Sequence, residues 1–173
     1  MSSTLLYWPS WIGKSTIWAL LAKKEWRTHI DTDLQFTKRY GSISDFIKEH
    51  WIDAFRKIEW EILKKYLWTW DVVSLWWWTL LLSENQQLAD STWNVITLMA
   101  DVETLIARVL TDRANHRPLS QSEEMIRKLY HERYKHYTEQ KIILTLGANE
   151  TVEKVMKNIQ RVQHRTKLLE AIY

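Results

Sequence analysis

The most informative segment of the chain reads Leu5-Leu6-Tyr7-Trp8-Pro9-Ser10-Trp11-Ile12-Gly13-Lys14-Ser15-Thr16. Its second half matches the end of the phosphate-binding loop G-x-x-x-x-G-K-[ST], which follows a buried strand and opens a helix. In such a loop, Lys14 reaches the β- and γ-phosphates of a nucleotide, and Ser15 ligates Mg²⁺. The segment therefore predicts strand, phosphate loop and helix. Position 8, where the motif has its first glycine, holds Trp8.

Tryptophan and glycine occur in unusual numbers. The chain has 12 Trp and 3 Gly, whereas an average glycine usage of about 7 % predicts roughly 12 Gly. Trp8 and Trp11 lie in the phosphate loop, and Trp26, Trp68 and Trp70 stand where helices should end, the usual place of a C-cap glycine. We hypothesise that most of these Trp are glycine codons, UGA, read with the wrong genetic code. The alternative is a Trp-rich membrane-interface or stacking surface, but such residues should follow a helical or strand period and these do not.

Length and composition favour one globular domain. A chain of 173 residues can bury a sizeable core, and we expect a single domain over 1–173 with a lid at 111–122 and a C-terminal helical extension at 163–173. No run approaches the roughly 18 apolar residues of a membrane span, and the start lacks signal-peptide features, so cytoplasm is the expected location. The net charge of +3 is interspersed. We therefore expect a monomer that acts on anionic small molecules, without nucleic-acid or membrane partners.

Strand and helix patterns alternate along the chain. Strands are expected at 4–7, 28–30, 71–75, 94–99 and 141–146. Helices are expected at 14–24, in pieces over 34–67 with breaks near 41 and 51, at 101–110, at 123–138 and at 150–172. This alternation predicts an α/β fold of the P-loop NTPase type, with a parallel sheet of about five strands flanked by helices and a small mobile lid.

Two carboxylates follow the second expected strand, in Asp31-Thr32-Asp33. Ligands bind at the carboxyl ends of strands in open α/β sheets, and side chains two apart on an extended segment share a face. One carboxylate could serve Mg²⁺ while the other accepts a proton from a substrate hydroxyl. Taken alone, the pattern also fits a solvated turn or a helix cap.

A larger set of motifs resembles the shikimate kinases over about Thr4 to Val162. That family carries F-R-x-x-E, a G-G-G turn after the third strand, and R-P-L in the lid. The matches in this chain, in family order and spacing, are the phosphate loop, Asp31-x-Asp33, Phe55-Arg56-x-x-Glu59, Val72-Val73-x-x before Trp76, Trp77 and Trp78, Arg117-Pro118-Leu119, and Arg133-x-x-x-Tyr137. Reading Trp as Gly restores the loop as GPSGIGKST, the turn as VVSLGGGTL, and a glycine before Ile52.

The resemblance implies an ATP site and a set of catalytic groups. Asp33 would be the catalytic base, with Lys14 on the phosphates and Arg117 closing from the lid. Mg²⁺ would lie near Ser15 and Asp31. The implied ATP-binding residues are Trp11, Ile12, Gly13, Lys14, Ser15, Thr16, Arg108 and Arg117. Arg113 competes with Arg108 for the place against adenine.

The resemblance also implies a substrate. Arg56 and Arg133 would hold the carboxylate of shikimate, Asp33 would bind the reacting hydroxyl, and positions Trp76, Trp77 and Trp78 match glycines whose backbone lies against the ring. The implied reaction is ATP-dependent phosphorylation of the 3-hydroxyl of shikimate, in aromatic amino-acid biosynthesis.

Other interpretations remain open at this point. Without the other motifs, Arg56 and Arg133 would fit surface ion pairs. A kinase of another small polyol, such as a gluconate kinase, is a second candidate, but it does not share the F-R-x-x-E pattern. If the Trp residues are literal, three adjacent indoles would fill the substrate pocket. The chain would then be an inactive nucleotide-binding or regulatory module.

Overall fold

A computed structural model describes residues 2–8, 14–76, 78–92, 94–111, 122–147 and 150–170, with the side chains of 14–16, 108–111 and 167–170 outside the description. The strands are β1 (Thr4–Tyr7), β2 (His29–Asp31), β3 (Val72–Ser74), β4 (Val95–Met99) and β5 (Ile143–Thr145). The helices are α1 (Lys14–Lys24), α2 (Thr32–Tyr40), α3 (Ile43–Tyr66), the 3-10 turn η1 (Thr79–Leu81), α4 (Ser83–Asp90), α5 (Val102–Thr111), α6 (Glu123–Thr138) and α7 (Val152–Glu170).

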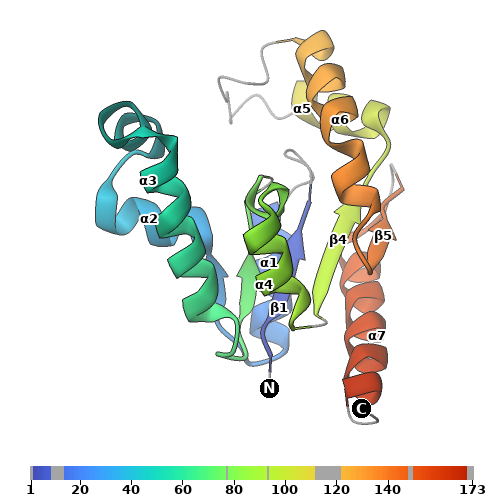
Figure 1. The fold of residues 1–173 in the computed structure, drawn as a ribbon. Coiled ribbons are helices and arrows are strands. Elements are labelled where there is room, and N and C mark those ends of the chain that lie inside the picture. Colours follow the sequence, from blue (N-terminus) through green and yellow to red (C-terminus); the bar gives the residue numbers. More distant parts are fainter. Residues whose placement is uncertain are drawn as a thin grey trace.

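The strands form a single parallel sheet in the order β2-β3-β1-β4-β5. Strand β1 lies in the centre, between β3 and β4. The chain passes from β1 to the edge strand β2, returns to β3, and then crosses β1 to β4 and β5 on the other side, where Figure 1 shows β4 and β5 next to each other. Such a reversal places the ligand crevice beyond the carboxyl end of the central strand. The predicted α/β fold with about five parallel strands is confirmed.

Alternating residues of β1 face two separate cores, which explains why the whole strand is buried. Leu6 packs in a cluster with residues of α1 and α7, whereas Leu5 and Tyr7 pack with residues of α3, α4 and α6. Helices α1 and α7 therefore cover one face of the sheet, and α3, α4 and α6 cover the other. The end of β1 is thereby surrounded by elements from distant parts of the chain.

Asp31-Thr32-Asp33 is extended only at Asp31, so the helix-cap alternative is correct and the expectation that both carboxylates lie on one face of an extended segment was wrong. Asp31 ends β2 and caps α2, because its Oδ1 accepts a hydrogen bond from the backbone N–H of Leu34 at 3.0 Å. Asp33 consequently lies in the first helical turn. An aspartate at this position satisfies a helix N–H that otherwise has no partner, so the helix begins at once after the strand.

Elements η1 and α4 were not predicted from the sequence. The α4 segment reads SENQQLAD and offers few apolar residues to mark a helical period. It is held by tertiary contacts instead: Asn85 and Ala89 are buried, and the Asn85 Nδ2 donates to the backbone carbonyl of Thr79 at 2.9 Å. This contact joins α4 to the turn that follows β3.

Three tryptophans adopt backbone conformations that favour glycine. Among the described residues other than glycine, those with positive φ are Trp26 (55°), Trp51 (68°) and Trp70 (60°). Trp26 follows α1, Trp70 follows α3, and Trp51 interrupts α3 where the sequence predicted a break. The left-handed region costs an L-residue with a side chain about 1–2 kcal/mol. Trp68, also predicted at a C-cap position, lies outside this group.

The predicted division into a kinase domain, a lid at 111–122 and an extension at 163–173 stays a prediction. Residues 112–121 lie outside the described part of the chain. Helix α7 passes through residue 163 without a break, and Gln163 is buried against the sheet. In the described ranges, no helix has the length and apolar character that crossing a membrane requires.

Candidate active site

The candidate site lies at the carboxyl ends of β2, β3 and β1, where α2 begins. The hydroxyl of Thr32 is buried and donates to the carbonyl of Ser74 at 3.0 Å, which fastens the start of α2 to the end of β3. Asp33 follows directly and lines a small cavity with Phe55 and Glu59 of α3. The carboxylate predicted as the base is thus held at the end of the sheet where ligands bind.

A buried carboxylate orients the guanidinium of Arg56. Glu59 is 5 % exposed, and its Oε2 accepts a hydrogen bond from Arg56 Nη1 at 2.8 Å. Its Oε1 accepts from the Thr79 hydroxyl at 2.7 Å. Burial raises the pKa of Glu59, while the hydrogen bonds from Thr79 and Arg56 oppose that rise. Glu59 therefore bonds Arg56 with one oxygen and Thr79 of η1 with the other.

Arg133 approaches the same region from α6. It is half-buried and lies one helical turn before Tyr137, which is buried. Burial lowers the pKa of Arg133, and the nearby Tyr137, Glu132 and Tyr7 oppose the shift. Tyr7, at the end of β1, lies within electrostatic reach of both Arg133 and Glu59. Tyr7 therefore lies near Arg133 and near the carboxylate that holds Arg56.

The indoles of Trp76 and Trp78 occupy the space beside Arg56 and Glu59. The rings of Trp76 and Trp78 are 4.1 Å apart between centroids, and the Arg56 guanidinium lies 4.8 Å from the centre of the Trp78 ring. The cavity lined by Asp33, Glu59 and Trp76 has a volume of about 10 Å³, which is room for about one water. This cavity beside Asp33 is therefore far too small for a substrate such as a sugar-sized acid.

Arg56 also borders an open cavity on its other side. That cavity has a volume of about 490 Å³ and lies between α3 and the start of α4. Its lining residues are Asp53, Arg56, Lys57, Trp60, Leu82, Ser83, Glu84 and Asn85. Of these two cavities, Asp33 lines the small one and Arg56 lines the open one.

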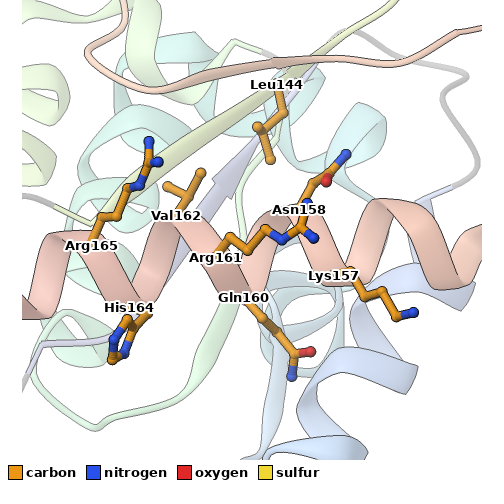
Figure 2. A pocket seen from close by; sticks show the side chains of 8 residues that line it. All are labelled: Leu144, Lys157, Asn158, Gln160, Arg161, Val162, His164 and Arg165. Carbon is orange, nitrogen blue, oxygen red and sulfur yellow. The ribbon is translucent and has the colours of Figure 1, made fainter.

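A separate groove of about 740 Å³ runs between α7 and β5 (Figure 2). It is lined by Leu144, Lys157, Asn158, Gln160, Arg161, Val162, His164 and Arg165. Strand β5 is the edge of the sheet farthest from β2, which carries Asp31. This groove therefore lies away from the strand ends that hold the predicted catalytic groups, despite its larger volume.

Much of the predicted nucleotide site lies outside the described residues. This applies to Trp11, Ile12, Gly13, Arg113 and Arg117, and to the side chains of Lys14, Ser15, Thr16 and Arg108. Trp77 of the predicted substrate site also lies outside the described residues. The helix expected after the loop begins at Lys14. Arg108 lies on α5.

The residues predicted to hold Mg²⁺ fit that ion by their chemistry. Asp31 uses Oδ1 for its cap bond, and among the described residues no hydrogen bond is made to Oδ2. A carboxylate and a serine hydroxyl are oxygen donors, and Mg²⁺ is commonly held by one or two such groups together with substrate phosphates. No cluster of three or more His, Asp or Glu side chains in the described ranges could hold a metal by itself. The donor set suits an ion that arrives with a nucleotide.

Sequence reasoning assigned no role to Glu59, Thr79 or Tyr7. Glu59 could have been found, because a Glu three residues after an Arg on a helix lies on the same face and can pair with it. Thr79 and Tyr7 carried no comparable signal. Their contacts join segments that are distant in the chain.

Comparison with known proteins indicates the same family as the sequence motifs. The profile of the family described as shikimate kinase matches residues 12–163. A shikimate kinase from Enterococcus faecalis is 31 % identical over 150 residues, which are 85 % of this chain and 89 % of that protein.

Solved structures show the same fold. The shikimate kinase from Acinetobacter baumannii in complex with shikimate superposes with a TM-score of 0.78 at 22 % identity, covering 97 % of this chain and 96 % of that one. A gluconokinase from Sinorhizobium meliloti reaches 0.56 at 11 % identity, covering 96 % and 97 %. With the profile spanning most of the sequence and the Enterococcus relative covering most of both chains, this chain belongs to the shikimate kinase family.

Proposed function

We propose that the chain transfers the γ-phosphoryl group of ATP to the 3-hydroxyl of shikimate, in aromatic amino-acid biosynthesis. Family membership supports the reaction, and one arrangement in the structure supports its location. Glu59 is buried, holds Arg56, and lines the same cavity as Asp33. An arginine whose direction is set by a buried carboxylate, next to a second carboxylate at the sheet end, suits an anionic substrate with a reacting hydroxyl.

In this proposal, three side chains bind shikimate. Arg56 and Arg133 hold its carboxylate, for which the planar fork of guanidinium donors is suited. Asp33 accepts the proton of the 3-hydroxyl as the oxygen attacks phosphorus. Positioning and charge stabilisation supply most of the catalysis in such reactions, because little covalent chemistry is left to the protein.

The phosphate loop and the lid serve the nucleotide. Lys14 contacts the β- and γ-phosphates, and Arg117 stabilises the transferring charge when the lid closes and excludes water. Ser15 and Asp31 hold Mg²⁺, which when bound neutralises charge on the phosphate oxygens. The loop backbone at Trp11, Ile12, Gly13 and Thr16 surrounds the phosphates, and Arg108 stacks on adenine.

We further propose that the native protein has glycine at most of the twelve tryptophan positions. Positive φ at Trp26, Trp51 and Trp70 supports this, because glycine adopts that region without strain. The cavity of about 10 Å³ beside Asp33 supports it as well, since Trp76 forms part of its wall. Glycine at 76 and 78 would open space between Asp33 and Arg56, where the two indoles now lie.

The remaining expectations concern the state of the protein in the cell. We propose a cytoplasmic monomer without nucleic-acid or membrane partners. The gluconate kinase alternative is not favoured, since the gluconokinase structure is less similar than that of the shikimate kinase. The inactive-module alternative applies only to a protein that truly carries Trp76, Trp77 and Trp78.

Expression of two versions side by side tests the proposal. We expect shikimate-dependent ADP production from a chain with glycine at all twelve positions and none from the chain as written. In the glycine version, Asp33→Asn should abolish turnover with little change in ATP affinity, whereas Asp45→Asn, an exposed control, should not. Activity with gluconate but not shikimate would refute the substrate. Equal activity from both versions, or UGG at all twelve codons, would refute the glycine assignment.

A further inference from the structure

Thr79, the first residue of η1, makes hydrogen bonds with all three of its polar groups. Its backbone N–H donates to the carbonyl of Trp76 at 3.0 Å, and its hydroxyl donates to Glu59 Oε1 at 2.7 Å. Its carbonyl accepts from Asn85 Nδ2 at 2.9 Å. Thr79 is 1 % exposed, so these bonds form away from water. The residue thereby joins the segment after β3 to α3 and to α4.

The side chains that bond to Thr79 are buried as well. Glu59 is 5 % exposed and Asn85 is 1 % exposed. A buried acceptor that loses its donor keeps the full cost of desolvation, so these bonds are expensive to break. The β-branched side chain of Thr79 is stiff at χ1, which gives its hydroxyl a defined direction relative to the backbone. The backbone position of Thr79 therefore determines where Glu59 Oε1 lies.

The bond from Thr79 to Glu59 continues to the proposed substrate site. The other oxygen of Glu59, Oε2, accepts from Arg56 Nη1 at 2.8 Å. The terminal torsion of a Glu side chain is soft, so a carboxylate bonded through one oxygen can rotate. Because Thr79 holds Oε1, the direction in which Oε2 meets Arg56 is fixed too. An unbroken series of hydrogen bonds thus runs from the backbone after β3 to the guanidinium.

We propose that Thr79 is a positioning residue that holds the Arg56 guanidinium in a fixed orientation relative to the backbone segment after β3. In the proposed reaction, this guanidinium binds the carboxylate of shikimate and the backbone at 76–78 lies against its ring. Thr79 acts through Glu59, and by this route it keeps the two contact surfaces in register. The inference rests on the proposed function, because it assigns Thr79 a part in recognising the acid group of shikimate.

Thr79→Val in the glycine version tests this, since valine keeps the shape of threonine and removes the hydroxyl. We expect the KM for shikimate to rise about tenfold, with kcat and the KM for ATP little changed. The preference for shikimate over its methyl ester, measured as a ratio of kcat/KM values, should fall by about the same factor, because the ester lacks the charge that Arg56 recognises. Thr79→Ser should recover most of this preference, whereas Thr79→Ala should not.

Thr92→Val is the matched control. Thr92 is also 1 % exposed, and its hydroxyl donates to the carbonyl of Ala89 at 2.7 Å. The variant therefore loses a comparable buried hydrogen bond outside the series that ends at Arg56, and it should keep the acid-over-ester preference. A double-mutant cycle tests the route: in a Glu59→Gln background, Thr79→Val should change the preference by less than about twofold, because its effect passes through the carboxylate.

The possible results separate the role of Thr79 from the proposed function. An active parent whose preference is unchanged by Thr79→Val and by Thr79→Ala, even if the melting temperature falls, would overturn the role of Thr79 and leave the function standing. The same loss from Thr92→Val, or a full effect of Thr79→Val in the Glu59→Gln background, would also overturn it. A parent that neither binds nor phosphorylates shikimate would overturn both.

Discussion

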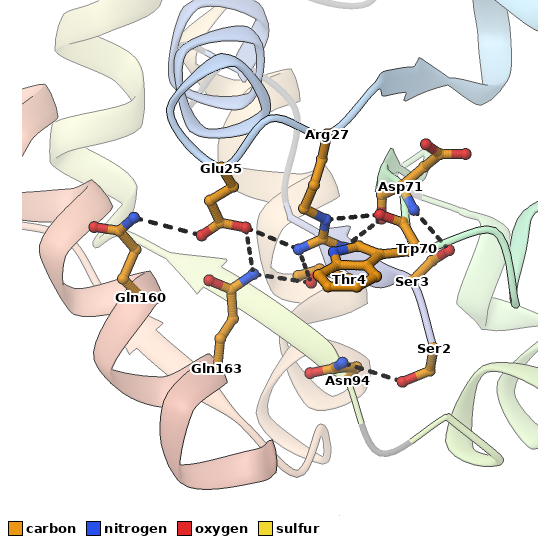
Figure 3. A network of polar contacts seen from close by, with 10 residues as sticks. All are labelled: Ser2, Ser3, Thr4, Glu25, Arg27, Trp70, Asp71, Asn94, Gln160 and Gln163. Carbon is orange, nitrogen blue, oxygen red and sulfur yellow. Dashed lines mark hydrogen bonds and ion pairs between the residues drawn. The ribbon is translucent and has the colours of Figure 1, made fainter.

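Each end of the sheet holds an arginine, and the two arginines are bound in different ways. At the amino ends of the strands, Arg27 has a side chain only 4 % exposed. Figure 3 shows its guanidinium between β1 and the segment before β3. Nε donates to the carbonyl of Trp70 at 2.7 Å and Nη2 to that of Asp71 at 2.7 Å, while Nη1 donates to Thr4 and Glu25 at 2.9 and 2.8 Å.

At the carboxyl ends of the strands, Arg56 uses far fewer of its N–H donors for hydrogen bonds within the protein. Its side chain is 20 % exposed, and among the described residues its hydrogen-bond partner is the carboxylate of Glu59. One side of the guanidinium lies on the ring of Trp78. Since an Arg has five N–H donors, several remain for a ligand. Arg27 links β1 to the segment before β3, whereas Arg56 is oriented by Glu59 and keeps N–H donors available for a ligand.

The largest effect should come from Arg27→Ala. Removing this buried guanidinium takes one donor each from the Glu25 carboxylate, the Thr4 hydroxyl and the carbonyls of Trp70 and Asp71. We expect the free energy of unfolding to fall by about 3–5 kcal/mol. Urea denaturation measures this, with Lys48→Ala as the control, because the Lys48–Asp45 pair is exposed and worth little. An Arg27→Ala protein as stable as its parent would show that the network is dispensable.

Arg56→Ala should act on catalysis in the glycine version. We expect kcat/KM for shikimate to fall by a factor equivalent to about 2–4 kcal/mol, because a charge-assisted contact to the carboxylate is lost. The KM for ATP should stay close to that of the parent. Steady-state kinetics with each substrate varied decides the point, with the exposed Arg39→Ala as control. Equal loss toward ATP and shikimate would contradict the assignment.

Replacing tryptophan by glycine where the backbone φ is positive should modestly stabilise the protein at both ends of the sheet. Trp70 presents its carbonyl to Arg27, and Trp51 interrupts the helix that carries Arg56. Trp70→Gly and Trp51→Gly should each raise the free energy of unfolding by about 1 kcal/mol, through relief of backbone strain. Trp68→Gly is the control, being exposed but without positive φ. A gain as large from Trp68→Gly would mean that φ is not the cause.

The smallest effect concerns His29, which begins β2 and bonds across to β3. Its Nε2 lies 3.1 Å from the Ser74 hydroxyl, and burial lowers its pKa below the ordinary 6.5, with Asp31 opposing the shift. The folded state therefore binds the proton less readily than the unfolded state, so stability should decrease as pH falls below about 6.5. Melting temperatures from pH 7.5 to 5.5 measure this. His29→Gln should flatten the curve; an unchanged slope would assign it to other groups.

The fold could be predicted to a large extent because its signals are local. The apolar run before Gly13-Lys14-Ser15 marks β1 and α1, β4 is a continuous apolar run, and apolar residues recur at helical spacing in α7. Element ends were less certain: Asp31 ends β2 and also caps α2, so Asp33, expected in an extended segment, lies in a helix. Propensity could not decide where the helix begins, since aspartate suits a turn as well as a cap, and the bond from Leu34 to Asp31 shows that it begins at once.

The candidate site was only partly predictable. The spacing of Arg56 and Glu59 by itself placed both on one face of a helix, because three residues are close to one helical turn. The contact of Tyr7 with Tyr137, the bond from Thr79 to Glu59 and the saturation of Arg27 depend on the order in which strands pair and on which helices cover each face. The sequence alone determined which local elements form and which residue types they carry. Only the tertiary structure decided which of those residues meet, because such contacts join distant segments whose approach no local pattern encodes.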